Sequence, residues 1–125
     1  MEGIQYFTGL SYLNLSNNKI SDLTPISSLK SLETLTVSFN KITDVSPLKL
    51  LTNLKHAYLS FNNIEDISPL KDLDNLWLLD ISENKVKDIS PLIDNQNLTF
   101  LILDGNPLVL ANVPTVLKKC PNYLQ

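Results

Sequence analysis

The chain has 125 residues, of which 43% are hydrophobic and 18% are charged, and its formal net charge at pH 7 is −3. This composition is typical of one globular domain large enough to bury a core, and it excludes a disordered chain. The 13 acidic residues outnumber the 10 basic ones, and no cluster of Lys and Arg stands out. We therefore expect no nucleic-acid partner, because nucleic-acid affinity depends mainly on cationic contacts.

No apolar run approaches the length that a bilayer span needs, so the sequence predicts no membrane partner. The N-terminal residues also lack the basic start and apolar core of a signal peptide. The single cysteine, Cys120, cannot form an internal disulfide, and nothing demands an oxidising compartment. The location of the protein is therefore left open, although the sequence as given favours the cytoplasm.

In chain order, residues 1–9 match the second half of a repeat whose period is 22 residues. No capping element stands ahead of them, so the first full strand, around Leu13, is expected to form an unpaired sheet edge. We expect this edge to pack against another copy of the chain or to continue into further sequence. Three apolar residues of this segment have equivalents one period later, namely Met1 with Leu23, Ile4 with Ile26, and Phe7 with Leu29.

Four full repeats follow without an insertion, and together with the ends they form a single domain. Each unit has the pattern LxxLxLxxNxI, which occurs five times and is highly specific. The repeats comprise residues 10–31, 32–53, 54–75 and 76–97, and residues 98–125 hold the last strand and a C-terminal cap. The recurring asparagines are Asn18, Asn40, Asn62, Asn84 and Asn106.

The first half of each repeat predicts a short strand, because alternating leucines lie on one face of a strand. One such strand cannot bury its leucines alone, whereas parallel strands stacked about 4.8 Å apart bury them in a continuous core. The asparagine follows where the chain turns inward, and its amide can bond the turns of adjacent repeats. The sequence therefore predicts a solenoid.

The second half of each repeat predicts the return path. A Ser or Thr followed by Pro is typical of a helix start, with the hydroxyl as the cap and the proline in the first turn. Apolar residues spaced three apart suit one short helical or 3-10 turn after each proline. The four pairs are Thr24 with Pro25, Ser46 with Pro47, Ser68 with Pro69, and Ser90 with Pro91.

The last segment loses this pattern and predicts a helical cap beginning at Pro114, with Pro121 and Leu124 finishing it. Its apolar positions at helical spacing are Val113, Val116, Leu117 and Cys120. Inside the repeats, Asn95 replaces an apolar residue, and we expect its side chain to bond the backbone that enters the last repeat. Phe39 and Phe61 precede two of the recurring asparagines and are expected to stack on each other.

These residues and the phrase NxIxDISPLxxLxNL resemble the leucine-rich repeat family, in particular the 22-residue class of bacterial internalin-like and eukaryotic phosphatase-regulating proteins. The resemblance implies an α/β fold shaped as a curved right-handed horseshoe. It also implies a parallel β-sheet on the concave face, short helical or 3-10 segments on the convex face, and a C-terminal helical cap. Relatives of this kind bind a protein partner on the concave sheet.

Neither metal binding nor catalysis is predicted. Calcium needs about six to eight converging oxygens, whereas the recurring carboxylates come once per repeat and are expected to accept bonds from their own turns. The one histidine, His56, can lie diagonally near Asp80, but no serine stands at nucleophile-elbow spacing from a histidine. We therefore expect no cofactor and no enzyme activity. The recurring acids are Asp22, Asp44, Asp66 and Asp88.

The outward positions of the strands are not dictated by the repeat and are free to serve a ligand. In the second half of the chain they gather aromatic, aliphatic and acidic residues, as protein-binding hot spots do. β-propensity alone also admits single aromatic residues on an exposed strand, but this number in one neighbourhood favours a protein-binding patch. The predicted patch residues are His56, Tyr58, Trp77, Leu78, Asp80, Phe100, Ile102 and Asp104.

The predicted function is that of a protein–protein interaction module, with a protein partner whose identity the residues do not name. The alternative is a structural spacer or self-assembling repeat fragment without a dedicated ligand. In that case the uncapped N-terminal edge is the expected site of self-association.

Overall fold

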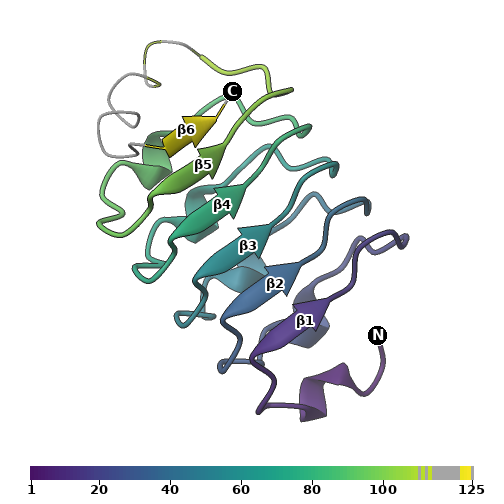
Figure 1. The fold of residues 1–125 in the computed structure, drawn as a ribbon. Coiled ribbons are helices and arrows are strands. Elements are labelled where there is room, and N and C mark those ends of the chain that lie inside the picture. Colours follow the sequence, from purple (N-terminus) through teal and green to yellow (C-terminus); the bar gives the residue numbers. More distant parts are fainter. Residues whose placement is uncertain (110, 112, 114–121, 125) are drawn as a thin grey trace.

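The computed structural model covers residues 1–125 and describes all of them except residues 110, 112, 114–121 and 125. Each repeat contributes one strand of three residues to a single parallel sheet, in which the strand order follows the chain (Figure 1). Paired residues on β1 to β5 are 22 positions apart, so the sequence period is also the register of the sheet. The strands are β1 (Tyr12–Asn14), β2 (Thr34–Thr36), β3 (His56–Tyr58), β4 (Leu78–Asp80), β5 (Phe100–Ile102) and β6 (Asn122–Leu124).

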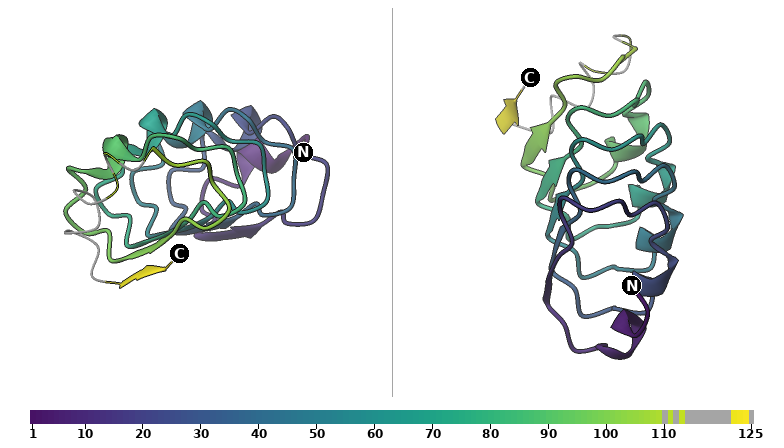
Figure 2. Two further views of the ribbon diagram at one scale, coloured as in Figure 1. Left: turned by 90° about the horizontal axis from the view of Figure 1, so that it is seen from above. Right: turned by 90° about the vertical axis from the view of Figure 1, so that its right-hand side faces the viewer.

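The return paths hold one 3-10 turn each, and these turns lie on the side of the coil opposite the sheet (Figure 2). Proline occupies the first turn of four of them, where its missing N–H leaves no bond unmade. This arrangement confirms the α/β solenoid predicted from the repeat. The turns are η1 (Ile4–Tyr6), η2 (Thr24–Ile26), η3 (Ser46–Leu48), η4 (Ser68–Leu70) and η5 (Ser90–Leu92).

The expected hydroxyl caps are wrong, because Ser or Thr is the first residue of each of the four 3-10 turns that contain proline, and the cap position belongs to the apolar residue before it. The N–H groups that such a hydroxyl would cap bond backbone carbonyls, since in η3 the N–H of Leu48 donates to Val45 and that of Lys49 donates to Ser46. The aspartate two residues ahead of the turn accepts from the N–H of the Ser or Thr itself. In the second full repeat, Asp44 Oδ1 accepts from the backbone N–H of Ser46 at 2.8 Å, and Asp44 Oδ2 accepts from the Ser46 hydroxyl at 3.0 Å. The acid is thus part of the turn.

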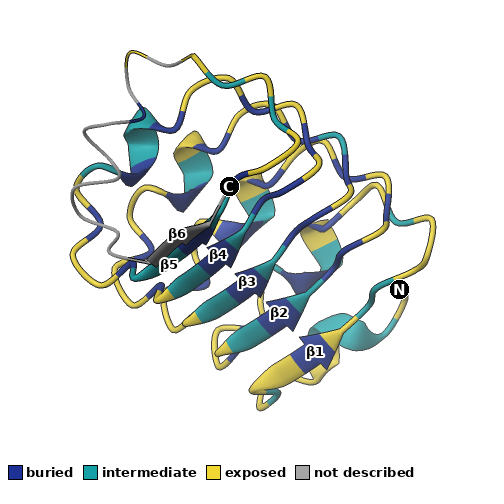
Figure 3. Cartoon of the chain, turned by 45° about the horizontal axis from the view of Figure 1, so that its top comes forward, coloured by how far each residue is buried: buried dark blue, intermediate teal, exposed yellow. Residues whose placement is uncertain are grey.

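The apolar side chains of successive repeats form one continuous core between the sheet and the 3-10 turns. Figure 3 shows that buried residues recur on the strands and on the 3-10 turns from repeat to repeat. Strand leucines such as Leu35 and Leu79 are fully buried, and burying a side chain of this size stabilises the fold by about 1.5–3 kcal/mol. At β1 the burial weakens, since Leu13 keeps 9% exposure and both of its strand neighbours are exposed. The solenoid is therefore less covered at β1 than at β2 to β5.

The predicted C-terminal helical cap lies mostly outside the described residues, since residues 114–121 belong to the undescribed part. Leu124, which was expected to finish that cap, is instead the last residue of β6. This strand pairs in parallel with β5 and extends the sheet by one rung. In the described part of the chain, no helix has both the length and the apolar character needed to cross a membrane.

Candidate functional site

The register of the sheet brings six of the eight predicted patch residues into two rows. His56, Leu78 and Phe100 form one row across β3, β4 and β5, and Tyr58, Asp80 and Ile102 form the other. All six are partly exposed, whereas the residues between them on the same strands are fully buried. The alternation of a strand thus presents these two rows on the outward face of the sheet.

Trp77 joins this arrangement from the entrance of β4. Its indole ring meets the His56 ring edge-on, with centroids 5.6 Å apart, and meets the Phe100 ring with centroids 4.7 Å apart. Both geometries are those that aromatic pairs prefer. The ring nevertheless remains 43% exposed, so three rings from adjacent repeats form one cluster that is open to solvent.

Hydrogen bonds to both neighbouring repeats fix the backbone at Trp77. Its N–H donates to the Lys55 carbonyl at 2.8 Å, and its own carbonyl accepts from the N–H groups of Thr99 and Phe100 at 2.9 and 3.0 Å. Strand residues held by such bonds lose little freedom when a ligand binds, which favours affinity. The aromatic cluster is therefore pre-organised.

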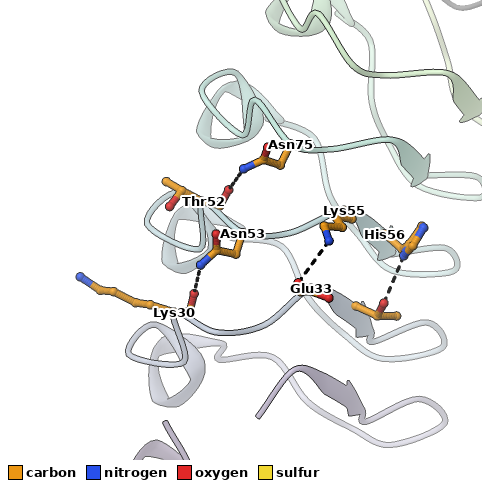
Figure 4. A network of polar contacts seen from close by, with 8 residues as sticks. Lys30, Glu33, Thr52, Asn53, Lys55, His56 and Asn75 are labelled. Carbon is orange, nitrogen blue, oxygen red and sulfur yellow. Dashed lines mark hydrogen bonds and ion pairs between the residues drawn. The ribbon is translucent and has the colours of Figure 1, made fainter. Parts of the chain in front are cut away.

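The sequence suggested that His56 can lie near Asp80, but its side-chain hydrogen bond goes to another residue. His56 Nδ1 lies 3.1 Å from Thr34 Oγ1 on β2, toward the N-terminal side (Figure 4). Asp80 is engaged elsewhere, because its Oδ1 accepts from the backbone N–H of Ser82 at 3.0 Å and from the Ser82 hydroxyl at 2.6 Å. The imidazole is thus fixed by a hydroxyl and a ring contact, without a carboxylate.

An open hollow lies beside the aromatic cluster at the strand entrances. Its lining includes three residues that sequence reasoning missed, Lys55, Asn75 and Asn97, together with His56 and Trp77. Asn75 and Asn97 each stand three residues before the first residue of a strand, and an asparagine recurs there at Asn53 one period earlier. This recurrence is the sequence signal that could have identified them. The hollow joins polar groups to an exposed aromatic wall, a combination that small binding sites commonly have.

The polar wall of this hollow is held by bonds between repeats, as Figure 4 shows. Asn75 Nδ2 donates to the Thr52 carbonyl at 2.9 Å, and Asn53 Nδ2 makes the same bond to Lys30 one repeat earlier, at 2.8 Å. Lys55 Nζ lies 3.2 Å from Glu33 Oε1, but both side chains are about half exposed. Pairs of this kind contribute little to stability, so the lysine remains available to a ligand.

Asp104, the last predicted patch residue, lies at the opposite end of the strands from Trp77. Its side chain is exposed, and its carbonyl accepts from the N–H of Glu83 at 2.8 Å. The predicted patch is therefore a band that crosses the sheet from strand entrance to strand exit, with the aromatic cluster at one end and a carboxylate at the other.

The recurring asparagines perform the structural role predicted for them. Asn62 is buried; its Nδ2 donates to the Val37 carbonyl of the preceding repeat at 3.1 Å and to two carbonyls of its own turn, and its Oδ1 accepts from the N–H of Ile42 at 3.0 Å. Asn95 also behaves as expected, since its Oδ1 accepts from the N–H groups of Asn97 and Leu98 at the entrance to the last repeat. These amides belong to the scaffold.

The recurring aspartates are also structural. The hydroxyl and the N–H of Thr24 hold the pKa of Asp22 below its ordinary value, and the N–H and hydroxyl of Ser46 do the same for the pKa of Asp44. Hydrogen bonds to the ionised form explain both directions. Within the described ranges, no group of three or more potential metal ligands comes together.

The chain matches one protein-family model and several solved structures. A family model described as leucine-rich repeats (two copies) matches residues 8–50 and 52–94, which together make up more than half of the chain. A comparison with curated proteins finds no match.

Three solved structures are similar over most of the chain. Internalin C2 of Listeria monocytogenes has a TM-score of 0.83 and 36% identity, and the match covers 85% of this chain and 47% of the internalin. For the internalin inlF of the same organism the values are 0.81 and 38%, with 91% and 34% covered. A repeat protein of Leptospira interrogans has a TM-score of 0.88 at 27% identity, with 98% and 33% covered. The chain spans less than half the length of each of these proteins.

Proposed function

This chain belongs to the leucine-rich repeat family, whose members are typically non-enzymatic modules that bind protein partners, and we propose that it recognises a protein through the outward face of its sheet. The observation that carries this proposal is the cluster of Trp77 with His56 and Phe100. Three packed rings, one of them 43% exposed, offer a rigid apolar anchor point. Exposed aromatic residues surrounded by polar groups are typical of binding hot spots.

The proposed interface is the predicted eight-residue patch together with the hollow beside it. Leu78 and Ile102 add aliphatic surface next to the rings, while Asp80 and Asp104 place carboxylates toward the strand exits. A partner that fits this surface carries apolar side chains for the ring cluster and donors or cations for the carboxylates. Charges at the margin of such an interface mainly set its specificity and association rate.

The environment of His56 supports binding more than proton transfer. A catalytic base needs a reacting group and an orienting partner within hydrogen-bond reach, whereas this imidazole bonds a threonine hydroxyl and packs against an indole. We therefore propose a contact role for His56 and no catalytic role for the chain.

The test compares two variants in capture of partners from cells that naturally express the protein. The patch variant combines Tyr58→Ala, Leu78→Ala and Phe100→Ala, and the matched control is Leu50→Ala, an exposed apolar residue between η3 and β3. We expect the wild-type chain and the control to retain the same partner and the patch variant to lose it. Thermal melting checks that all three are folded. Equal capture by the folded patch variant would contradict the proposal.

Self-association through the β1 edge is a second candidate, supported by hydrogen bonds that the first repeat lacks. Among the described residues, the Ser16 hydroxyl is the one buried side-chain oxygen or nitrogen without a hydrogen-bond partner. Asn18 donates only to carbonyls of its own repeat, unlike the asparagines that follow it. A second copy that adds strands to this edge would cover both groups. Tyr12→Lys, which places a charge on the edge, should then shift sedimentation velocity from dimer to monomer. A wild-type monomer at millimolar concentration rules this candidate out.

A further inference from the structure

The position before each recurring asparagine has a left-handed backbone in every repeat. The φ angles run from 51° to 76° along the column Asn17, Phe39, Phe61, Glu83 and Gly105. Asparagine and glycine adopt this conformation readily, whereas it is uncommon and costly for a bulky residue. Since the column accepts asparagine, glutamate or glycine, the scaffold itself does not require phenylalanine at two successive rungs.

The two phenylalanines form an exposed stack at the strand exits, as expected from the sequence. Their ring centroids are 4.3 Å apart and their planes differ by 8°. Phe39 nevertheless keeps 49% exposure and Phe61 keeps 45%. Each ring therefore contacts its neighbour with one face, and the rung order turns the second face of Phe61 toward the rung of Glu83.

The carboxyl end of Glu83 extends toward the next rung, away from the rung of Phe61. A Cβ atom added to Gly105 would lie 2.5 Å from Glu83 Cδ and 2.5 Å from Glu83 Oε1. The carboxylate thus lies over the glycine, in space that any other residue would fill. No hydrogen bond or ion pair joins the Glu83 side chain to another described residue. A half-exposed aromatic ring and a carboxylate without a partner among the described residues therefore lie on adjacent rungs.

We propose that Phe61 and Glu83 form a binding site for an arginine side chain of a partner protein. A guanidinium is flat and weakly hydrated, so it stacks on an aromatic face while its edge donates two parallel bonds to a carboxylate. Phe39 supports the stack from behind. The compact lysine ammonium satisfies the carboxylate but lacks the plane that matches the ring, so the site discriminates between the two cations.

Neither Phe61 nor Glu83 belongs to the patch proposed above, although the site borders its strand-exit end, where the N–H of Glu83 donates to the Asp104 carbonyl. Phe61 follows β3 by three residues, so the site lies at the strand exits and the Trp77 cluster lies at the strand entrances. Evidence against the arginine site would leave the proposal for the eight-residue patch unchanged, and evidence against the patch would leave the arginine site unchanged. Together the two would require a partner that spans the width of the sheet.

The test titrates the full chain, labelled on its phenylalanine rings, with an acetylated and amidated tri-arginine peptide followed by NMR. The matched peptides are tri-citrulline, which keeps the flat side-chain end without charge, and tri-lysine, which keeps the charge without the plane. We expect the arginine peptide to shift the Phe61 ring signals, and to bind at least about threefold more tightly than tri-lysine, in line with the modest energy of exposed cation–π contacts. Equal affinity for tri-citrulline or tri-lysine, or an unshifted Phe61, would overturn the proposal.

Three variants complete the test. Glu83→Gln keeps the shape and backbone of the site, and Phe61→Leu removes the ring; each should weaken the arginine peptide about threefold or more. Glu65→Gln makes the same charge change at an exposed carboxylate outside the site and should leave affinity unchanged. Equal weakening by Glu65→Gln would mean unspecific charge attraction. If Phe61→Leu instead converts a wild-type dimer into a monomer, the stack is a contact between copies and the proposal fails.

Discussion

The outward faces of β1–β2 and of β3–β5 rest on the same scaffold and carry different side chains. The outward residues are Tyr12 and Asn14 on β1 and Thr34 and Thr36 on β2. The equivalent positions of the later strands hold one carboxylate and otherwise only aromatic and aliphatic groups, including imidazole, phenol and benzyl. The buried positions between them are apolar throughout. The comparison teaches that the repeat conserves its inward residues for packing and leaves its outward residues to function.

The largest expected effect is a difference in unfolding free energy between core substitutions beneath the two regions. Leu79→Ala, under the aromatic cluster, should lower the free energy of unfolding by about 2–5 kcal/mol, because it leaves a cavity in a fully buried site. Leu13→Ala, at the less covered β1 edge, should cost clearly less. Urea denaturation of both variants measures the difference, and equal losses would show that burial does not weaken toward β1.

The asparagine column offers the next comparison. Asn62→Ala removes a buried amide that bonds both its own and the preceding repeat, so we expect a loss of about 1–3 kcal/mol. Asn18→Ala removes an exposed amide that bonds only its own turn and should cost less than half as much. Chemical denaturation again provides the measurement. A larger loss at Asn18 would contradict the assigned roles.

The aromatic cluster predicts a coupling that the first two strands lack. A double-mutant cycle on Trp77→Ala and Phe100→Ala should give an interaction energy of about 0.5–1.5 kcal/mol, the usual value for such ring pairs. The control cycle on Tyr12→Ala and Thr34→Ala, paired across β1 and β2, should give a smaller coupling. Unfolding free energies of the single and double variants supply both cycles.

The smallest expected effect concerns acid. The pKa of Asp44 is lowered in the folded state, so its ionised form adds stability that is present above its unfolded pKa of about 3.9 and is lost as the pH falls through the lower folded value. Asp44→Asn should therefore make the urea midpoint of unfolding depend slightly less on pH between about pH 5 and pH 2, the range in which the carboxyl titrates. Glu65→Gln, for which no such turn is formed, serves as the control in the same urea titrations at each pH.

Much of the fold followed from local pattern. The period set the strand register, the alternation of leucines set the buried face, and proline after Ser or Thr marked the 3-10 turns. The prediction of a hydroxyl cap failed because the N–H groups that the Ser46 hydroxyl would cap bond backbone carbonyls, and the hydroxyl itself donates to Asp44. The fate of Leu124 was also missed, since pairing with β5 depends on where the chain returns in space.

The sequence by itself determined the solenoid, its register and the set of outward residues, because each depends on spacing that repeats every 22 positions. Only the tertiary structure decided how those outward groups meet. It placed the indole of Trp77 between two rings, turned His56 toward Thr34, and laid Glu83 over Gly105 away from Phe61. The physical reason is that a spacing fixes which backbone positions are neighbours, while the direction of a side chain depends on the shape and charge of everything packed around it.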